Sequence, residues 1–151
     1  MSGIKSKDTK PEILLRKSLF NKGLRYRKNY KQIFGTPDIA FVSKKAVIFV
    51  HGCFWHGHNN KNCKLSNIPK SNTEFWLRKI QRNHDRDTEV LKELTKEGVR
   101  YLIVWECTMK GKGKYELSKL TNYVYKWVIA GSQNIQISGG KSTLEEGVKI
   151  L

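Results

Sequence analysis

Histidine and cysteine are concentrated between Val50 and His58, where the sequence VHGCFWHGH holds three histidines, one cysteine and two aromatic residues. Two more cysteines follow, Cys63 close by and Cys107 far along the chain. With Cys53 and His58 they make a Cys₃His set, the donor types that Zn²⁺ takes in closed tetrahedral sites. Because an irregular loop has little core of its own, such an ion would fasten the loop to the strand expected before Cys107.

Other arrangements of these residues stay open. The spacing C-x₄-H-x₄-C is not a common zinc-finger signature, so the cysteines could instead be buried thiols without a metal. His51 or His56 could also take the place of His58 as a ligand. A disulfide framework is not expected, because the chain has three cysteines, an odd number, and looks intracellular.

An acid beside a strand end makes a second candidate site. Asp38 follows Pro37 at the start of an apolar run, and a hairpin with the next run would bring it near Val50 and His51. Mg²⁺ takes oxygen ligands and keeps several waters, so the Asp38 carboxylate and the Val50 carbonyl can be enough to hold it beside a phosphate group. His51 and His56 would flank the ion, and one of them could accept a proton from the attacking water.

Asp87 falls on the apolar side of an expected helix, where an acid needs a partner, and a histidine is the expected one. Structural roles compete with these chemical ones. The Pro-Asp pair is common in turns, Asp87 could face solvent beside Arg86, and Glu12 could serve only as a helix cap.

Aromatic residues occur in two pairs, Phe54-Trp55 and Phe75-Trp76. Exposed aromatic side chains can stack on nucleic-acid bases or wedge between them. Two adjacent bulky residues in a loop are hard to bury together, which favours such a role for Phe54 and Trp55. Phe75 is expected in the core.

The elements that must position these residues follow from periodicity, caps and breakers. Their order predicts an α/β fold with a small mixed sheet flanked by helices, and a tail from Gln133 that is weakly patterned. A hairpin symmetric about Lys44 would place Asp38 opposite Val50, within one residue of slip. The inner stripe of the long helix is expected to hold Leu77, Ile80, His84, Asp87, Leu91 and Leu94. In chain order, the expected elements are a helix over 9–22, an extended segment over 24–30, a hairpin of strands 39–42 and 46–50, a helix from a capping box at 71–74 to about 97, a strand over 99–107 and a helix over 115–130.

The composition indicates a folded protein with a polyanionic partner. The 151 residues include 29 Lys and Arg against 13 Asp and Glu, a formal net charge of +16, and 38% are hydrophobic, too many for a disordered basic tail. A polyphosphate backbone is the natural counterion, and an anionic membrane is the alternative. With no apolar run of about 18 residues and no signal peptide, we expect a soluble cytoplasmic protein. Of the two candidate partners we favour the polyphosphate, and we expect no membrane partner.

Several motifs together resemble the very short patch repair (Vsr) mismatch endonucleases. They are HGCFWHGH at 51–58, PKSNTEFW at 69–76, N-x-x-R-D at 83–87 and LIVWEC at 102–107. The likeness extends upstream through IKSKDTKPE at 4–12 and the Pro37-Asp38 pair, and reaches to about residue 130. It implies a single domain over 1–151 with a type II restriction-endonuclease-like fold, an N-terminal arm 1–8, a catalytic core of about 9–130 and a tail 131–151.

The resemblance implies an enzyme that nicks one strand beside a T:G mismatch, which arises by deamination of 5-methylcytosine. The nick would leave a 5′-phosphate and start very short patch repair. Asp38 and the Val50 carbonyl would hold a catalytic Mg²⁺. His56 would act on the nucleophilic water with Asp87 as its partner, and His51 and Glu12 would complete the site through waters around the ion. Cys53, His58, Cys63 and Cys107 fall where the family has its structural Zn²⁺.

The resemblance also implies how DNA is held. Phe54, Trp55 and Trp76 match aromatic residues that intercalate beside the mismatch from the major groove, and Met1 matches an arm methionine in the minor groove. The partner would be double-stranded DNA with a T:G mismatch, bound by a monomer in the bacterial cytoplasm at the nucleoid, with mismatch-repair proteins as candidate recruiters.

Three departures from the family pattern stand out. The sequence starts at the arm methionine, so a weaker minor-groove clamp is expected. Residues 59–62 lengthen the interval between His58 and Cys63. No acidic-x-Lys follows Asp38, and His51 and His56 are expected to fill that place.

Two other functions compete with this interpretation. One is a restriction-type Mg²⁺ endonuclease that cuts both strands of matched DNA, and the other is a non-catalytic, zinc-stabilised nucleic-acid-binding module. A zinc hydrolase or deaminase is disfavoured, because neither H-E-x-x-H nor H-x-E followed by P-C-x-x-C is present.

Overall fold

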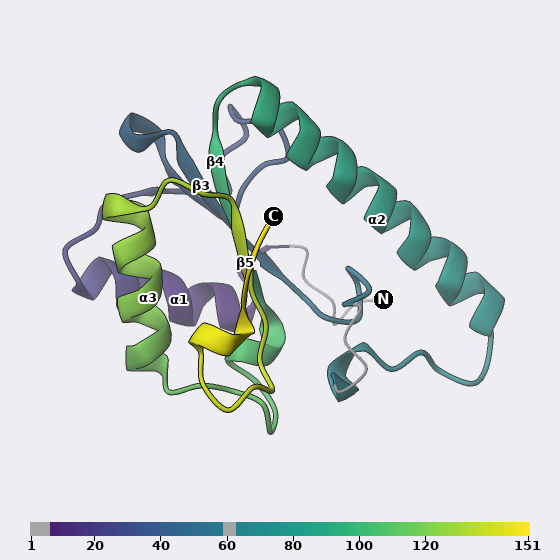
Figure 1. Cartoon of the computed structure of the whole chain (residues 1–151). Coiled ribbons are helices and arrows are strands. Elements are labelled where there is room, and N and C mark those ends of the chain that lie inside the picture. Colours follow the sequence, from purple (N-terminus) through teal and green to yellow (C-terminus); the bar gives the residue numbers. More distant parts are fainter. Residues whose placement is uncertain (1–6, 59–62) are drawn as a thin grey trace.

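A mixed β-sheet forms the centre of the computed structural model, which describes residues 7–58 and 63–151 (Figure 1). In the described ranges the sheet has six strands in the order β1-β2-β3-β4-β5-β6. The pairs β3–β4 and β4–β5 are parallel, and the outer pairs are antiparallel. The strands are β1 (Arg27–Lys28), β2 (Ile39–Phe41), β3 (Ala46–His51), β4 (Arg100–Trp105), β5 (Ile135–Ile137) and β6 (Val148–Ile150), and the helices are α1 (Lys10–Asn21), α2 (Thr73–Lys96) and α3 (Leu117–Ala130).

Helices cover both faces of the sheet (Figure 1). On one face α1 and α3 pack through residues such as Leu15, Leu19 and Val124. On the other face the C-terminal half of α2 packs through Leu94 against Val47 and its neighbours. This arrangement explains why β3 and β4 are continuous apolar runs, since strands buried on both faces do not alternate. The predicted mixed sheet flanked by helices is therefore confirmed.

The hairpin that carries Asp38 slips by one residue from the symmetric arrangement. Ile39 pairs with Ile48, so Asp38 comes opposite Phe49 rather than Val50. The turn closes through Lys45 in the left-handed conformation, with a φ of 49°. The side chain of Asp38 can then reach the neighbouring backbone N–H, that of Val50.

The start of α2 differs from the sequence prediction. Asn72 is the N-cap, with a φ of 55° and no side-chain capping bond. The Thr73 hydroxyl instead donates to the carbonyl oxygens of Pro69 and Lys70, at 3.2 and 3.0 Å. The predicted capping box from Ser71 to Glu74 is therefore wrong, because the helix begins at Thr73, one residue too late for Glu74 to stand at the third helical position.

Two further predictions for α2 are also wrong. Leu77 is 52% exposed and Phe75 47% exposed, although the first was expected on the inner stripe and the second in the core. Figure 1 shows the physical reason, since the N-terminal half of α2 extends away from the sheet. That half is positioned instead by the loop after β3.

The tail forms regular structure that its weak pattern did not predict. β5 adds to β4 in parallel, and β6 closes the edge. Strands of three residues are too short to display a period. None of the helices in the described ranges combines the length and apolar character that a membrane span requires.

Candidate active site and metal centre

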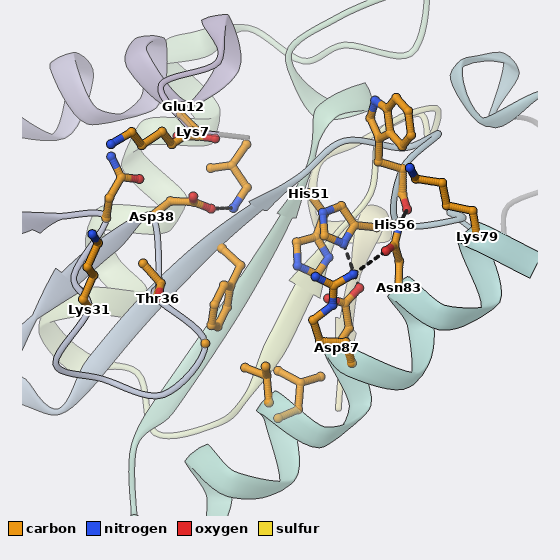
Figure 2. Close-up of a pocket in the computed structure, with 18 of the residues that line it drawn as sticks. Lys7, Glu12, Lys31, Thr36, Asp38, His51, His56, Lys79, Asn83 and Asp87 are labelled. Carbon is orange, nitrogen blue, oxygen red and sulfur yellow. Dashed lines mark hydrogen bonds and ion pairs between the residues drawn. The ribbon is translucent and has the colours of Figure 1, made fainter. Parts of the chain in front are cut away.

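A cleft of about 1110 Å³ extends from α1 and the segment before β2, past the end of β3, to the inner side of α2 (Figure 2). It brings together residues from separate parts of the chain: Glu12 from α1, Asp38 before β2, His51 and His56 at and after the end of β3, and Asp87 from α2. All five are residues that the sequence singled out. The cleft is also basic, lined by Lys7, Lys31, Lys79 and Arg86.

Asp38 is held at the end of β3 by a backbone contact. Its Oδ2 accepts the N–H of Val50 at 2.7 Å. In an extended strand the N–H and C=O of one residue point to the same side, so the Val50 carbonyl also faces the Asp38 side of the strand. A carboxylate and a carbonyl on one side of a strand end are the oxygen donors that Mg²⁺ takes.

Glu12 adds a second acid to this part of the cleft. It is buried and accepts hydrogen bonds from the Asp8 N–H at 2.8 Å and the Thr9 hydroxyl at 3.1 Å. Burial raises the pKa of Glu12. Burial, and next the charge of Glu12, raise the pKa of Asp38 to about 7. Two acids that line one cleft, both with raised pKa, fit a bound cation, which would stabilise both as carboxylates.

Arg16 supports these acids and was missed by the sequence analysis. Its guanidinium is buried, lies 2.7 Å from Asp8 and 3.8 Å from Glu12, and carries an Nη1 with no hydrogen-bond partner among the described residues. The signal for it was the spacing of four residues from Glu12, which places the two side chains on one side of α1.

His56 and Asp87 form the second half of the cleft. Nδ1 of His56 lies 2.7 Å from Oδ2 of Asp87. Burial alone would raise the pKa of Asp87, but the hydrogen bond with His56 and the neighbouring histidines outweigh it, and the pKa is lowered. When Asp87 is ionised, Nδ1 of His56 carries the proton and donates it to the hydrogen bond. Nε2 of His56 is then left as a base.

The ring of His51 stacks against the ring of His56. The two imidazoles are stacked, with centroids 3.8 Å apart and 4° between the planes, and the edge of Trp105 meets His51 on another side. Burial lowers the pKa of His51 to about 3, so its ring is neutral near pH 7. The lone pairs of parallel rings do not converge on one point, so His51, His56 and Asp87 are poorly arranged to chelate one ion directly, although their ligand atoms lie within 4.8 Å of one another.

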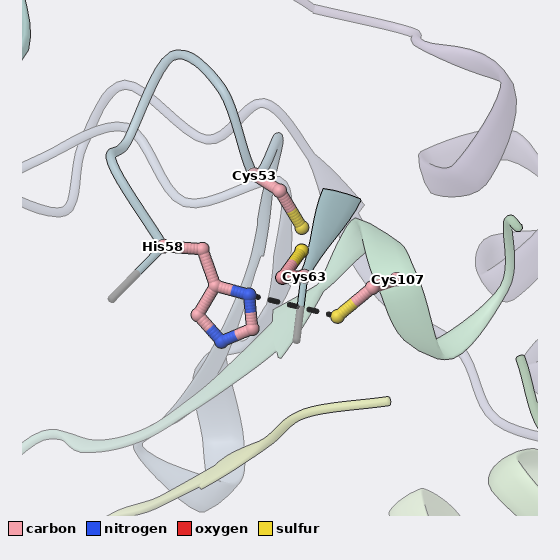
Figure 3. Close-up of side chains that lie close together, drawn as sticks. All are labelled: Cys53, His58, Cys63 and Cys107. Carbon is pink, nitrogen blue, oxygen red and sulfur yellow. Dashed lines mark hydrogen bonds between the residues drawn. The ribbon is translucent and has the colours of Figure 1, made fainter. Parts of the chain in front are cut away.

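The cysteines and His58 form a separate, buried cluster next to the cleft (Figure 3). The ligand atoms of Cys53, His58, Cys63 and Cys107 all lie within 4.8 Å of one another, and Nδ1 of His58 is 3.6 Å from Sγ of Cys107. The Cys53–Cys107 hydrogen bond lowers the pKa of Cys107 and raises that of Cys53. Three free thiols and one imidazole nitrogen that converge in a buried place fit a tetrahedral Zn²⁺.

This grouping separates the histidines that the sequence left interchangeable. His58 joins the cysteines, whereas His51 and His56 face Asp87. Cys53 follows β3 and Cys107 lies in the turn Glu106–Thr108 after β4, so the cluster connects the loop to the sheet. The lengthened interval 59–62 lies outside the described residues.

Three aromatic side chains pack together at the mouth of the cleft. Phe54, Trp55 and Trp76 contact one another edge to face, with centroids 5.0 to 5.8 Å apart. Each is partly exposed, and Trp55 and Trp76 line the cleft. Met1, the predicted minor-groove contact, lies outside the described residues.

Two residues of α2 that had no predicted chemical role fasten the loop 52–58 that carries His56. Nδ2 of Asn83 donates to the Trp55 carbonyl at 2.7 Å, and Nε2 of His84 lies 2.9 Å from the Gly57 carbonyl. Gly57 allows this approach, since it has a φ of 59° and a Cβ there would lie 2.4 Å from Ile80. The period of the helix placed His84 on its inner side, but it could not identify a backbone carbonyl as the partner.

Comparisons with known proteins agree on one family. The family model for DNA mismatch endonuclease Vsr matches residues 1–62. The type II nicking enzyme V.NmeAIP of Neisseria meningitidis serogroup A is 53% identical over 74% of this chain and 78% of its own length. The type II nicking enzyme V.XorIIP of Xanthomonas oryzae pv. oryzae is 42% identical over 77% of this chain and 83% of its own. The DNA mismatch endonuclease Vsr of Escherichia coli K12 is 38% identical over 91% of this chain and 86% of its own.

Proposed function

We propose that this chain, which belongs to the Vsr family of DNA mismatch endonucleases, uses Mg²⁺ to nick one strand of duplex DNA beside a T:G mismatch. The family and the names of the relatives make it a DNA endonuclease that nicks. The mismatch, the metal, the product ends and the role of each residue are our proposal.

The observation that carries the proposal is the position of the hydrogen-bonded pair His56–Asp87 in the same cleft as the buried acids Asp38 and Glu12. A carboxylate that holds Nδ1 of a histidine leaves Nε2 free to act as a general base. The two acids, whose pKa values are both raised, provide a place for a cation. Together these are the two requirements for hydrolysing a phosphodiester with an activated water.

Asp38 and the Val50 carbonyl would hold the Mg²⁺, with Glu12 and His51 completing the site. When bound, the ion neutralises charge on the phosphate and polarises its oxygens. Nε2 of His56 accepts a proton from the attacking water, and Asp87 stabilises the imidazolium that forms. The new O–P bond forms as the P–O3′ bond breaks, and a proton passes to the leaving oxygen. The products are a 5′-phosphate and a 3′-hydroxyl.

The aromatic cluster would select the mismatch. Phe54, Trp55 and Trp76 lie at the mouth of the cleft, where they would insert between neighbouring bases. Insertion costs the free energy of unstacking those bases. A weakly paired T:G step costs less to open than a matched one, so selection comes from deformability. The predicted minor-groove contact of Met1 remains part of the proposal.

The cluster of Cys53, His58, Cys63 and Cys107 would hold a structural Zn²⁺. Four protein ligands leave no open position for a water, so the ion would not take part in catalysis. Its role would be to fasten loop 52–58, which carries His56, Phe54 and Trp55, to the strand end at Cys107.

We further propose that the protein acts as a monomer, because a nick in one strand needs one active site. It would act on the bacterial nucleoid, where its substrate lies, and mismatch-repair proteins are candidate recruiters. Its net charge of +16 predicts DNA affinity that falls steeply with salt.

A nicking assay tests this function. Labelled duplexes that differ only in one T:G or C:G pair, placed in several sequence contexts, are incubated with protein with and without Mg²⁺. We expect a single nick in the T-bearing strand that requires Mg²⁺ and is abolished by Asp38→Ala, while that variant still binds DNA.

Each alternative outcome identifies a competing function. Cleavage of both strands in matched duplexes would indicate a restriction-type enzyme. Binding without cleavage in any context would indicate a non-catalytic DNA-binding module. Nicking that survives Asp38→Ala would refute the assignment of the metal ligand.

A further inference from the structure

The segment after β5 touches the Cys/His cluster directly, although no ligand comes from it. Oγ of Ser138 lies 3.0 Å from Nε2 of His58. The backbone N–H of Gly139 donates to Sγ of Cys107 at 3.2 Å. Two of the four candidate ligands, His58 and Cys107, are therefore hydrogen-bonded to residues of the tail. The tail lies beyond the part of the chain that carries the motifs.

Gly139 lies against the turn after β4 with no room for a side chain. A Cβ at this position would lie 2.1 Å from the carbonyl oxygen of Cys107 and 2.8 Å from that of Gly113. Contacts with backbone atoms cannot be relieved by a rotamer change. The short approach that lets the Gly139 N–H reach the sulfur therefore requires glycine.

Hydrogen bonds with other parts of the chain hold this segment in place. The Tyr115 hydroxyl donates to the Ser138 carbonyl at 2.6 Å, and the Ser138 N–H donates to the Gly147 carbonyl at 2.9 Å. The Gly140 N–H donates to the Gly113 carbonyl, also at 2.9 Å. Ser138 and Gly139 are therefore positioned by contacts that do not involve the Cys/His cluster.

We propose that Ser138 and Gly139 are positioning residues of the zinc site, so that zinc and the strand pair β5–β6 stabilise each other. This inference rests on the proposed Zn²⁺. An imidazole that binds a metal through Nδ1 carries its proton on Nε2, and Oγ of Ser138 accepts a hydrogen bond from that N–H, which orients the ring. The Gly139 N–H stabilises the negative charge of the Cys107 thiolate.

The test measures zinc affinity by competition with a chromophoric chelator. Mutation of a residue that is hydrogen-bonded to a metal ligand typically lowers metal affinity by about 10–100-fold. We expect a loss of zinc affinity in this range for Ser138→Ala. Gly139→Ala should lose at least as much, because its Cβ displaces the segment from Cys107. Ser138→Thr keeps the hydroxyl and should restore most of the affinity.

Ser142→Ala is the matched control. This serine is exposed in the same tail and makes no hydrogen bond among the described side chains, so its loss should leave zinc affinity unchanged. Cobalt substitution adds a spectroscopic check. We expect Ser138→Ala to keep the thiolate-to-cobalt charge-transfer band of the wild type, because all four ligands remain.

The reciprocal measurement needs no variant. Removal of zinc from the wild-type protein should increase hydrogen exchange at the Gly139 amide and across Ile135–Ile137, as well as in loop 52–58. Equal zinc affinity in the wild type and Ser138→Ala, with no change of exchange in β5, would overturn this inference while leaving the zinc site intact. A wild-type protein that binds no zinc would overturn the proposed zinc site as well.

Discussion

His56 is oriented by Asp87, whose Oδ2 lies 2.7 Å from its Nδ1 across the gap between loop 52–58 and α2. The loop and the helix are far apart in the sequence, so the geometry of the proposed base depends on how α2 docks. The docking is reinforced by Asn83 and His84, which bond to backbone carbonyls on either side of His56. The helix therefore fixes both the ring and the loop that carries it.

The first prediction concerns this pair. Asp87→Asn removes the charge that stabilises the imidazolium of His56 and allows the wrong tautomer, so the single-turnover nicking rate should fall by about 10²–10⁴-fold. DNA affinity should change little, because Asp87 is a poor contact for a phosphate. Asp85→Asn is the matched control, since Asp85 is exposed and bonds only to Gln81 among the described side chains. A rate equal to that of the control would exclude Asp87 from the mechanism.

The second prediction concerns pH and Asp38. Its pKa in the folded protein is about 7, above its ordinary value of 3.8, so folding favours the protonated form. The stability that this provides is fully present below about pH 4 and is lost as the pH rises through 7. Asp38→Asn cannot ionise, so the wild type should lose stability relative to this variant as the pH rises.

Urea unfolding between pH 4 and 8 without Mg²⁺ measures this loss. If the whole pKa shift of Asp38 acted on stability, the free energy of unfolding would fall by about 4 kcal/mol. Because Asp38 is partly exposed, we expect a fall of about 2 kcal/mol. Thiol protonation affects both proteins and cancels in the difference. Mg²⁺ should recover the stability of the wild type near pH 8 and leave the variant unchanged. A difference that stays constant with pH would contradict the shifted pKa.

Much of the fold follows from local pattern. The apolar runs of β3 and β4 and the hairpin before them are identifiable from the sequence, and pairing within that hairpin brings Asp38 to Val50. Residue types suggested a Cys₃His set and the family resemblance pointed to His58, but the sequence left His51 and His56 open as alternatives, and only the fold groups His58 with the cysteines. The limits of the arm, core and tail remain predictions.

The remaining features depend on tertiary contacts. Arg16 looks like a surface arginine until α1 is placed on the sheet, where it meets Asp8 and Glu12. Ser138 and Gly139 lie in a tail with no period, and their partners are fixed only when β5 joins β4. Leu77 was misplaced because a helical period indicates which side of α2 is apolar but not how much of the helix the sheet covers.

The third prediction concerns the Cys/His cluster. Cys107→Ser removes one donor of the proposed zinc site, so zinc content should fall below one equivalent and the melting temperature should fall with it. Chelation should destabilise the wild type and leave the variant nearly unchanged. Metal analysis and thermal unfolding on the same samples check this. Full zinc occupancy in the variant would move the ligand set to His51 or His56.

The last prediction separates wedging from general attraction to DNA. Trp55→Ala and Trp76→Ala each remove a surface on which a base can stack, worth about 1–3 kcal/mol, so affinity for a T:G duplex should fall by about 5–150-fold. Affinity for the matched duplex should fall less, because it depends on lysine and arginine contacts that these variants keep. Phe20→Ala is the control, an aromatic residue 49% exposed at the end of α1 beside Arg25 and not part of the cleft lining. A fluorescent base analogue next to the mismatch should brighten on binding the wild type, since inserted side chains unstack it, and stay dim with the tryptophan variants. Equal losses on both duplexes would mean that the aromatic cluster binds DNA without sensing the mismatch.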